Sequence, residues 1–274
     1  MLRQIPLTMD PAAVASIEAR LEEICAGHGV AIPLAIESGS RAWGFPSPDS
    51  DYDCRFIFIR SPDDYLSLYA AHDVIETPLE ASLDVNGWDL AKSLKLLLKG
   101  NAVVIEWLTS PIIYSGKRWF RDEFLALARH LADRELIARH YLHLGERQRQ
   151  AYFADNKQFQ LKKLFYALRP AAALRWLRAH PAEAVAPMHF PSLIEECDPP
   201  EDIRRITRDL IEKKAVTREL GSGELPPAVA SFIDTEFDVA RKLFAPGPRP
   251  AMQEARREAQ QFFRAALDRA WSED

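Results

Sequence analysis

Two aspartates separated by one residue stand at the start of an apolar segment. Asp51 and Asp53 lead into residues 54–59, whose mostly apolar run predicts a β-strand. Because side chains two residues apart point to the same face of a strand, the two carboxylates should converge. Ionised carboxylates this close repel each other, and a divalent cation between them offsets that repulsion. The spacing therefore predicts a metal site.

A glycine–serine turn precedes the aspartates. Gly39 and Ser40 follow a short apolar strand predicted over residues 32–37. Backbone N–H groups and the serine hydroxyl in such a turn can donate to a phosphate, and Arg41 adds positive charge. An ordinary turn with positive φ is the alternative for Gly39. A phosphate-binding turn beside a two-carboxylate metal site is typical of phosphoryl or nucleotidyl transfer.

Asp51 and Asp53 have two alternative interpretations, a polar turn and a calcium-binding loop. They could simply form a polar turn after Pro48. A calcium loop of the EF-hand type needs Gly at its sixth position and Glu at its twelfth, and Cys54 and Arg60 stand there instead. The turn alternative stays open, whereas the calcium loop is excluded.

Several segments in order carry a resemblance to a known family. They are SGSRAWGF at 38–45, SDYDCRF at 50–56, DVNGWDL at 84–90, KGNAVVIEWL at 99–108, Ser110-Pro111 and LKKLFYALRP at 161–170. Together they resemble the DNA polymerase β-like nucleotidyltransferase superfamily, and within it the RlaP-type, RNA-repair-associated branch. The similarity covers roughly residues 30–175.

The pattern of apolar residues predicts an α+β fold. Strands are expected at 32–37, 51–59, 73–77 and 82–85, and helices at 11–27, 61–69, 90–99 and 102–108. From Trp119 onward the pattern is helical, at 118–132, 134–154, 157–179, 200–219, 226–244 and 250–271. We therefore expect a catalytic domain at 1–115, with a small mixed sheet and flanking helices, and a helical C-terminal domain at 116–274.

A third carboxylate is expected near the first two. Asp84 lies in the strand predicted over 82–85, and the sheet pairing that the resemblance implies places it beside Asp51 and Asp53. Its competitor, Asp89, precedes a helical run and is the better N-cap. We therefore select Asp84.

Basic and aromatic side chains are candidates for nucleotide binding. Lys92 follows the Asp84 segment, and Lys162, Tyr166 and Arg169 recur at the spacing of one helix face. An exposed amphipathic face predicts the same spacing, so both interpretations stay open. Trp43 and Phe45 are expected either to stack on a base or to pack the loop. Glu37 and Glu106 are expected to be structural.

Composition narrows the partners. The 274 residues carry a net charge of −5, which favours a small or terminal substrate over long nucleic acid held by a general basic field. No apolar run is long enough to cross a bilayer, and the N-terminus lacks the apolar region of a signal peptide. Three widely spaced cysteines fit a reducing compartment. We expect a cytoplasmic protein without a membrane partner.

The resemblance implies Mg²⁺-dependent transfer of a nucleoside monophosphate from an NTP to a hydroxyl, with release of pyrophosphate. In that scheme Asp51 and Asp53 bridge two Mg²⁺ ions and Asp84 binds one of them and helps to deprotonate the acceptor. Gly39 and Ser40 hold the phosphates, with Arg41, Lys162 and Arg169 offsetting charge. The acceptor is an RNA end, or else a small molecule or protein. A non-catalytic nucleotide-binding module or toxin–antitoxin partner is the alternative.

Overall fold

The computed structural model describes residues 1–80, 82–153, 159–217, 221–244 and 252–272. Its centre is a six-stranded mixed sheet in the order β1-β6-β2-β3-β5-β4. The strands are β1 (Leu2–Gln4), β2 (Val30–Glu37), β3 (Tyr52–Arg60), β4 (Val74–Glu76), β5 (Leu83–Asp89) and β6 (Ile113–Gly116). The predicted α+β fold class is confirmed.

Strand β3 forms the middle of the sheet because its apolar residues are buried on both faces. Phe56 and Phe58 belong to one hydrophobic cluster, and Ile57 and Ile59 belong to the other. It pairs antiparallel with β2 and parallel with β5, in a register that sets Asp53 opposite Asp84. The parallel pairing thus brings two distant acidic segments to the same end of the sheet.

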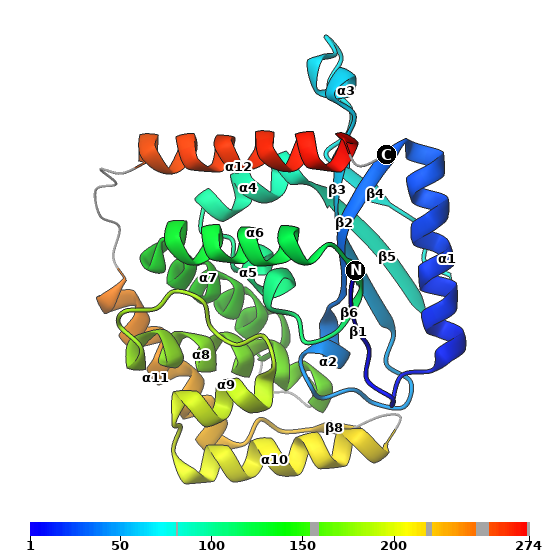
Figure 1. The fold of residues 1–274 in the computed structure, drawn as a ribbon. Coiled ribbons are helices and arrows are strands. Elements are labelled where there is room, and N and C mark those ends of the chain that lie inside the picture. The colour runs from blue at the N-terminus through cyan, green and yellow to red at the C-terminus, as the bar shows by residue number, and fades with distance from the viewer. Residues whose placement is uncertain (81, 154–158, 218–220, 245–251, 273–274) are drawn as a thin grey trace.

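Helices cover the two faces of the sheet unequally (Figure 1). On one face lies α1 (Pro11–His28), which Asp10 caps and which buries Val14, Ile17, Leu21 and Ile24. On the other lie α4 (Leu90–Leu98), α5 (Ala102–Thr109), α6 (Arg118–Leu131) and α12 (Met252–Ser272). Two short helices, α2 (Gly39–Ala42) and α3 (Pro62–Leu66), lie at loops of the sheet.

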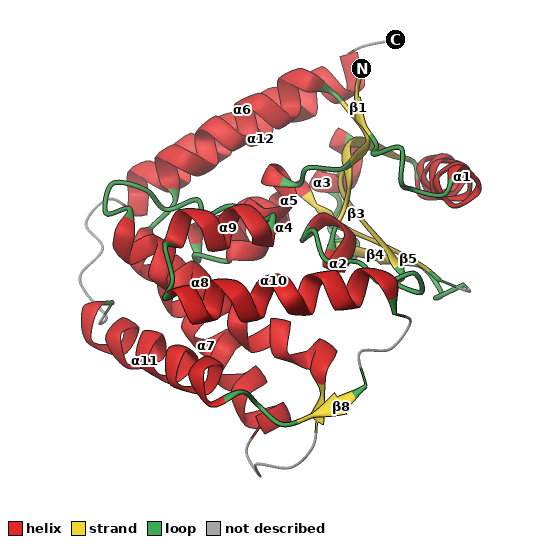
Figure 2. Ribbon diagram, turned by 90° about the horizontal axis from the view of Figure 1, so that it is seen from below, coloured by secondary structure: helices red, strands yellow, loops and turns green. Residues whose placement is uncertain are grey.

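The remaining helices pack together beside this layer (Figure 2). They are α7 (Arg134–Phe153), α8 (Leu164–Ala179), α9 (Phe190–Cys197), α10 (Glu201–Val216) and α11 (Pro227–Leu243). A 3-10 turn, η1 (Leu161–Lys163), precedes α8, and a two-stranded ribbon joins β7 (Phe159–Gln160) to β8 (Ser222–Gly223). One hydrophobic cluster runs from β2 and β3 through α8 to α12. The division at residue 115 stays a prediction.

Most of the predicted elements are present with small shifts. Ser61 and Asp89 cap their helices as expected. The helix predicted over 61–69 was too long, because Ser67 adopts an extended conformation and ends α3. Strands β1, β6, β7 and β8 and helices α2 and α9 were missed. The helix predicted over 157–179 was wrong at its start, because β7 and η1 occupy residues 159–163 and α8 begins at Leu164. The predicted helix ends at 154, 157–158, 218–219 and 250–251 lie outside the described residues.

The sequence predicted that no segment is long and apolar enough to cross a bilayer. Within the described ranges, none of the helices has both the length and the apolar character of a bilayer-spanning segment.

Candidate active site

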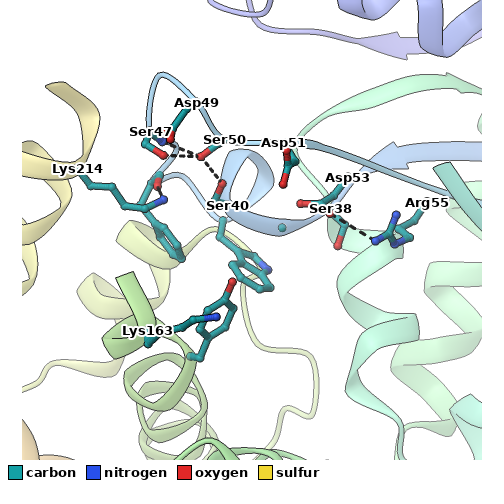
Figure 3. A pocket seen from close by; sticks show the side chains of 14 residues that line it. Ser38, Ser40, Ser47, Asp49, Ser50, Asp51, Asp53, Arg55, Lys163 and Lys214 are labelled. Carbon is teal, nitrogen blue, oxygen red and sulfur yellow. Dashed lines mark hydrogen bonds and ion pairs between the residues drawn. The ribbon is translucent and has the colours of Figure 1, made fainter. Parts of the chain in front are cut away.

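A pocket of about 390 Å³ lies where the sheet meets the helices. Strand β3 and the loop before it supply Asp51, Asp53 and Arg55, and α2 supplies Gly39 and Ser40. The opposite wall comes from the helical part of the chain, with Lys163, Tyr166 and Lys214. Figure 3 shows Lys163 and Lys214 approaching from the side opposite Asp51 and Asp53.

The two aspartates of the metal prediction lie together in this pocket. Asp51 is exposed just before β3, and the Asp53 side chain, on β3, is 28% exposed. Burial raises the pKa of Asp53; Arg55 opposes that rise, while the negative charges of Asp84 and Asp51 add to it. Both carboxylates face the same space (Figure 3). Their mutual repulsion is the electrostatic feature that a cation would relieve.

Gly39 is required by its conformation and by its neighbour. Its φ of +58° lies in the left-handed region, and a Cβ added there would overlap the Asp53 carboxylate. Ser38 N–H donates to the Asp53 carbonyl at 2.8 Å, so the turn is fixed directly against the strand. Any larger residue at position 39 would therefore displace Asp53.

Asp84 is adjacent to Asp53 but has protein partners. Arg55 donates to Asp84 at 2.6 Å and lies 3.4 Å from Asp53, so its guanidinium lies near both carboxylates. Asn86 donates to the other Asp84 oxygen. Asp84 is outside the set of residues that line the pocket. The structure brings the three acids to one end of the sheet, with Arg55 beside two of them.

Beneath Asp53 lies a buried carboxyl group. Glu37 is fully buried; it accepts from the Asp53 N–H at 2.9 Å and from the Tyr114 hydroxyl. Burial raises the pKa of Glu37 to about 7, against the two hydrogen bonds that lower it. Burial and the adjacent Glu37 likewise raise the pKa of Tyr114. Glu37 was expected to be structural, and here it accepts from the backbone N–H of Asp53 and so helps to fix the position of Asp53.

Several predicted phosphate-binding cations do not line the pocket. Arg41 donates to the backbone carbonyls of Ser50 and Asp51 and stacks on Tyr52. Lys92 pairs with Asp73 at 2.9 Å, and Arg169 pairs with the buried Glu106 at 2.9 Å.

The remaining predicted residues have mixed outcomes. Tyr166 lines the pocket, edge-on to Trp43. Lys162 belongs to η1, and its side chain lies outside the described part of the structure. Ser40 lines the pocket and donates to Ser50 at 3.0 Å. Asp89 caps α4, as its competitor role implied.

Sequence reasoning missed three basic residues of the pocket. Lys163 stands beside the predicted Lys162, and its ammonium lies 4.8 Å and 5.1 Å from the ring centres of Tyr152 and Tyr166. Lys214, on α10, donates to the Phe45 carbonyl at 2.6 Å. Arg55 belongs to the motif SDYDCRF, which was the one signal available for it. For Lys214 no local pattern was available, because its pocket role depends on contacts across the chain.

The side chains of the pocket suit an open magnesium site, which substrate and water complete, better than a closed site in which protein ligands alone hold the metal. Among the described residues, no group of three or more His, Cys, Asp or Glu side chains is arranged to hold a metal by itself. Mg²⁺ commonly binds one or two carboxylates and completes its shell with water and substrate phosphates. Asp51 and Asp53, which line an open pocket together with Gly39 and Ser40, match that requirement.

Comparisons with known proteins identify the family of this chain. The model of the family described as "RlaP: RNA repair pathway DNA polymerase beta family" matches residues 14–265. A relative, the "Uncharacterized protein YcgL" of Bacillus subtilis (strain 168), is 36% identical over 218 residues, which are 80% of this chain and 83% of that protein.

A solved structure was also found. It is a nucleotidyltransferase-like protein from Exiguobacterium sibiricum 255-15, with 10% identity over 93% of this chain and 80% of that one. The TM-score is 0.30, which is too low to indicate a shared fold.

Proposed function

The chain belongs to the RlaP family of RNA repair pathway DNA polymerase β-like proteins, and from that premise we propose that it is a nucleotidyltransferase. It transfers a nucleoside monophosphate from an NTP to a hydroxyl acceptor and releases pyrophosphate. The observation that carries this proposal is the pairing of Asp51 and Asp53 with the Gly39–Ser40 turn in one pocket. A carboxylate pair beside a phosphate-sized turn suits a metal-bound triphosphate.

In the proposed complex the acidic wall of the pocket holds Mg²⁺ and the opposite wall holds the nucleotide. Asp51 and Asp53 are the metal ligands. Bound Mg²⁺, two ions in the full scheme, supplies charge neutralisation at the phosphates and makes the attacking hydroxyl more acidic. Ser40 turns its hydroxyl from Ser50 to a phosphate oxygen, which requires only rotation about its side-chain bond.

The basic residues of the pocket take the remaining phosphate charge. We assign to Lys163 the phosphate-binding role predicted from the sequence for its neighbour Lys162, since Lys163 lines the pocket. Tyr166, half-exposed beside Trp43, provides an aromatic surface for the base. Such preorganised charge supplies most of the rate enhancement in many enzymes.

Asp84 is proposed as the third carboxylate, and Arg55 controls its availability. As long as Arg55 donates to Asp84 at 2.6 Å, the Asp84 carboxylate is held in an ion pair and is not available as a base. An arriving triphosphate is a stronger partner for a guanidinium, because its oxygens carry more charge. Transfer of Arg55 to the phosphates would free the Asp84 carboxylate from this ion pair, so that it could accept the acceptor's proton.

The acceptor is proposed to be an RNA end, in keeping with the repair setting in the family's description. The net charge of −5 argues against a long nucleic acid held by the whole surface and is compatible with a terminus held only at the pocket. The place of action is proposed to be the cytoplasm.

The deciding experiment is transfer of label from each α-³²P-NTP, with Mg²⁺, to RNA, protein, small hydroxyl compounds or the chain itself. We expect label transfer by the wild type and none by Asp53→Asn. Asp49→Asn is the matched control, because Asp49 also lines the pocket but is not one of the two proposed metal ligands. Binding of an NTP, titrated with and without Mg²⁺, gives a readout that does not need turnover.

One observation favours the alternative of a non-catalytic nucleotide-binding module. Arg55 donates to one oxygen of Asp84 and Asn86 donates to the other. This is the pattern expected of a carboxylate with a purely structural role. In that case Mg²⁺ would strengthen NTP binding, and no acceptor would become labelled. Label transfer that is lost in Asp53→Asn and kept in Asp49→Asn would exclude this alternative.

A further inference from the structure

A segment that projects from the sheet carries exposed apolar side chains. Figure 1 shows α3 and the chain after it standing clear of the molecule, beyond the C-terminal end of α12. Leu66, Leu68 and Tyr69 are 84%, 89% and 84% exposed. We call residues 61–73 the projecting segment. Large apolar side chains gathered on an exposed protrusion are typical of an interaction surface.

The projecting segment is also acidic. Asp63 and Asp64 lie in the first turn of α3. Asp64 completes a capping box with Ser61, so its carboxylate is used within the helix. Asp63 is exposed on the same turn. A partner for this segment should therefore offer apolar contacts together with positive charge.

A groove with these properties lies on the same chain, between α4 and α12. Its volume is about 690 Å³, and its apolar lining includes Leu94, Leu98, Met252 and Phe263. Lys95, Lys99 and Arg256 also line it and are exposed. We call it the α4–α12 groove. Its apolar floor and positive side chains complement the projecting segment in both respects.

The projecting segment does not fill the groove of its own chain. Tyr65 packs edge-on against Phe263, which lines the groove, with ring centres 5.0 Å apart. The next apolar residues along the segment point elsewhere, as their exposure shows. The projecting segment and the groove are thus adjacent within one chain, but the exposed apolar side chains of the segment are not buried in that groove.

We propose that the projecting segment of one copy binds in the α4–α12 groove of a second copy. Because segment and groove meet at Tyr65 and Phe263, a two-fold axis near that contact lets both copies exchange segments at once. Each copy then buries Leu66, Leu68 and Tyr69, and Asp63 approaches the positive side chains of the partner's groove. The proposal concerns the α12 side of the molecule and does not depend on nucleotidyl transfer.

The first test is the mass of the full chain in solution, by light scattering and sedimentation over a range of concentrations. We expect the wild type to have the mass of two chains and Leu66→Asp/Leu68→Asp that of one. Leu7→Asp is the control, since Leu7 is equally exposed but far from the segment in sequence, and it should leave the mass unchanged. Thermal unfolding checks that the variants remain folded.

The second test uses charge reversal to identify the contact. Asp63→Lys and Lys95→Glu/Lys99→Glu should each weaken self-association at least about tenfold, because each places like charges together. An equimolar mixture of the two variants should recover association, since one contact then has reversed charges and the other is wild type.

Either of two results would overturn the proposal. One is a wild type with the mass of a single chain at every concentration, which would leave the segment to an unrelated partner. The other is a dimer that both the leucine and the charge variants leave intact, or that mixing fails to restore.

Discussion

Two acidic regions of this protein have opposite surroundings. Glu106, on α5, is buried and receives Arg169 at 2.9 Å and the Tyr141 hydroxyl at 3.1 Å. Asp51 and Asp53 instead face a pocket, where burial and neighbouring negative charge raise the pKa of Asp53. The protein supplies Glu106 with partners and gathers the pocket acids against their own repulsion. That difference separates a carboxylate that stabilises the fold from carboxylates available to a ligand.

The basic residues divide in the same way. Arg169 shares a helix with Tyr166, yet it points to Glu106 and stacks on Trp43, while Lys163 lines the pocket. Proximity to a motif therefore does not make a cation functional. A cation that already pairs with a buried carboxylate, as Arg169 does with Glu106, is not available to a ligand.

The largest expected effect comes from breaking the buried pair. Arg169→Met leaves Glu106 ionised in a buried site without a counter-charge and should cost about 3–5 kcal/mol of unfolding free energy. The double variant Glu106→Gln/Arg169→Met should recover much of that loss. Urea unfolding measures both. A single variant within about 1 kcal/mol of the wild type would show that Glu106 is not held as described.

The next effect is a dependence on pH at Glu37. Its pKa is about 7 in the folded protein against an ordinary 4.5, so between these values the unfolded chain releases a proton that the folded chain keeps. Stability therefore falls as pH rises through this window, by on the order of 3 kcal/mol.

Glu37→Gln removes that contribution and keeps an acceptor for the Asp53 N–H. The unfolding free energy of the variant should exceed that of the wild type at pH 8 by more than it does at pH 5. Equal differences at the two pH values would contradict the assignment of the raised pKa to Glu37.

A smaller loss of stability, with a large loss of activity, is expected at Gly39. Gly39 and Gly29 have φ of +58° and +59°, and only at Gly39 would a Cβ meet another side chain. Alanine at either position should cost about 1–2 kcal/mol of strain. Gly39→Ala alone should also abolish label transfer, because it displaces Asp53. Equal activity in the two variants would mean that the position of Asp53 is unimportant.

The smallest effect on stability is expected at the pocket itself. Because burial disfavours the ionised form of Asp53, Asp53→Asn should unfold at the same free energy as the wild type or at a value higher by less than about 1 kcal/mol. Chemical unfolding without Mg²⁺ is the measurement. A clear loss of stability would place Asp53 in the same class as Glu106.

The sequence predicted the parts of this fold that depend on local pattern. The apolar run after Asp53 gave β3, and the capping residues Ser61 and Asp89 gave two helix starts. Strands β1 and β6 are three and four residues long and carry too little pattern to be recognised. Helix α9 is eight residues long and begins with Phe190-Pro191, and proline is common both in loops and in the first turn of a helix.

The sequence predicted which neighbouring residues would lie together in the pocket better than it predicted contacts across the fold. The convergence of Asp51 and Asp53 was predicted from strand geometry, and both line the pocket although Asp51 lies just before β3. The pairings of Arg169 with Glu106 and of Lys92 with Asp73 depend on how helices pack, and no spacing rule contains them. Helical periodicity identified the stripe of Lys162, Tyr166 and Arg169 but could not tell which of its members would be buried.

The loop between the glycine turn and the aspartates is held from a distance. Phe45 stacks on Phe165 at 4.3 Å between ring centres, and its carbonyl receives Lys214. A protein truncated after β6 would keep Asp49, Asp51 and Asp53 of the pocket and still lose both of these anchors. The loop and its aspartates therefore cannot be transplanted alone, because residues more than a hundred positions downstream help to fix the shape of the loop.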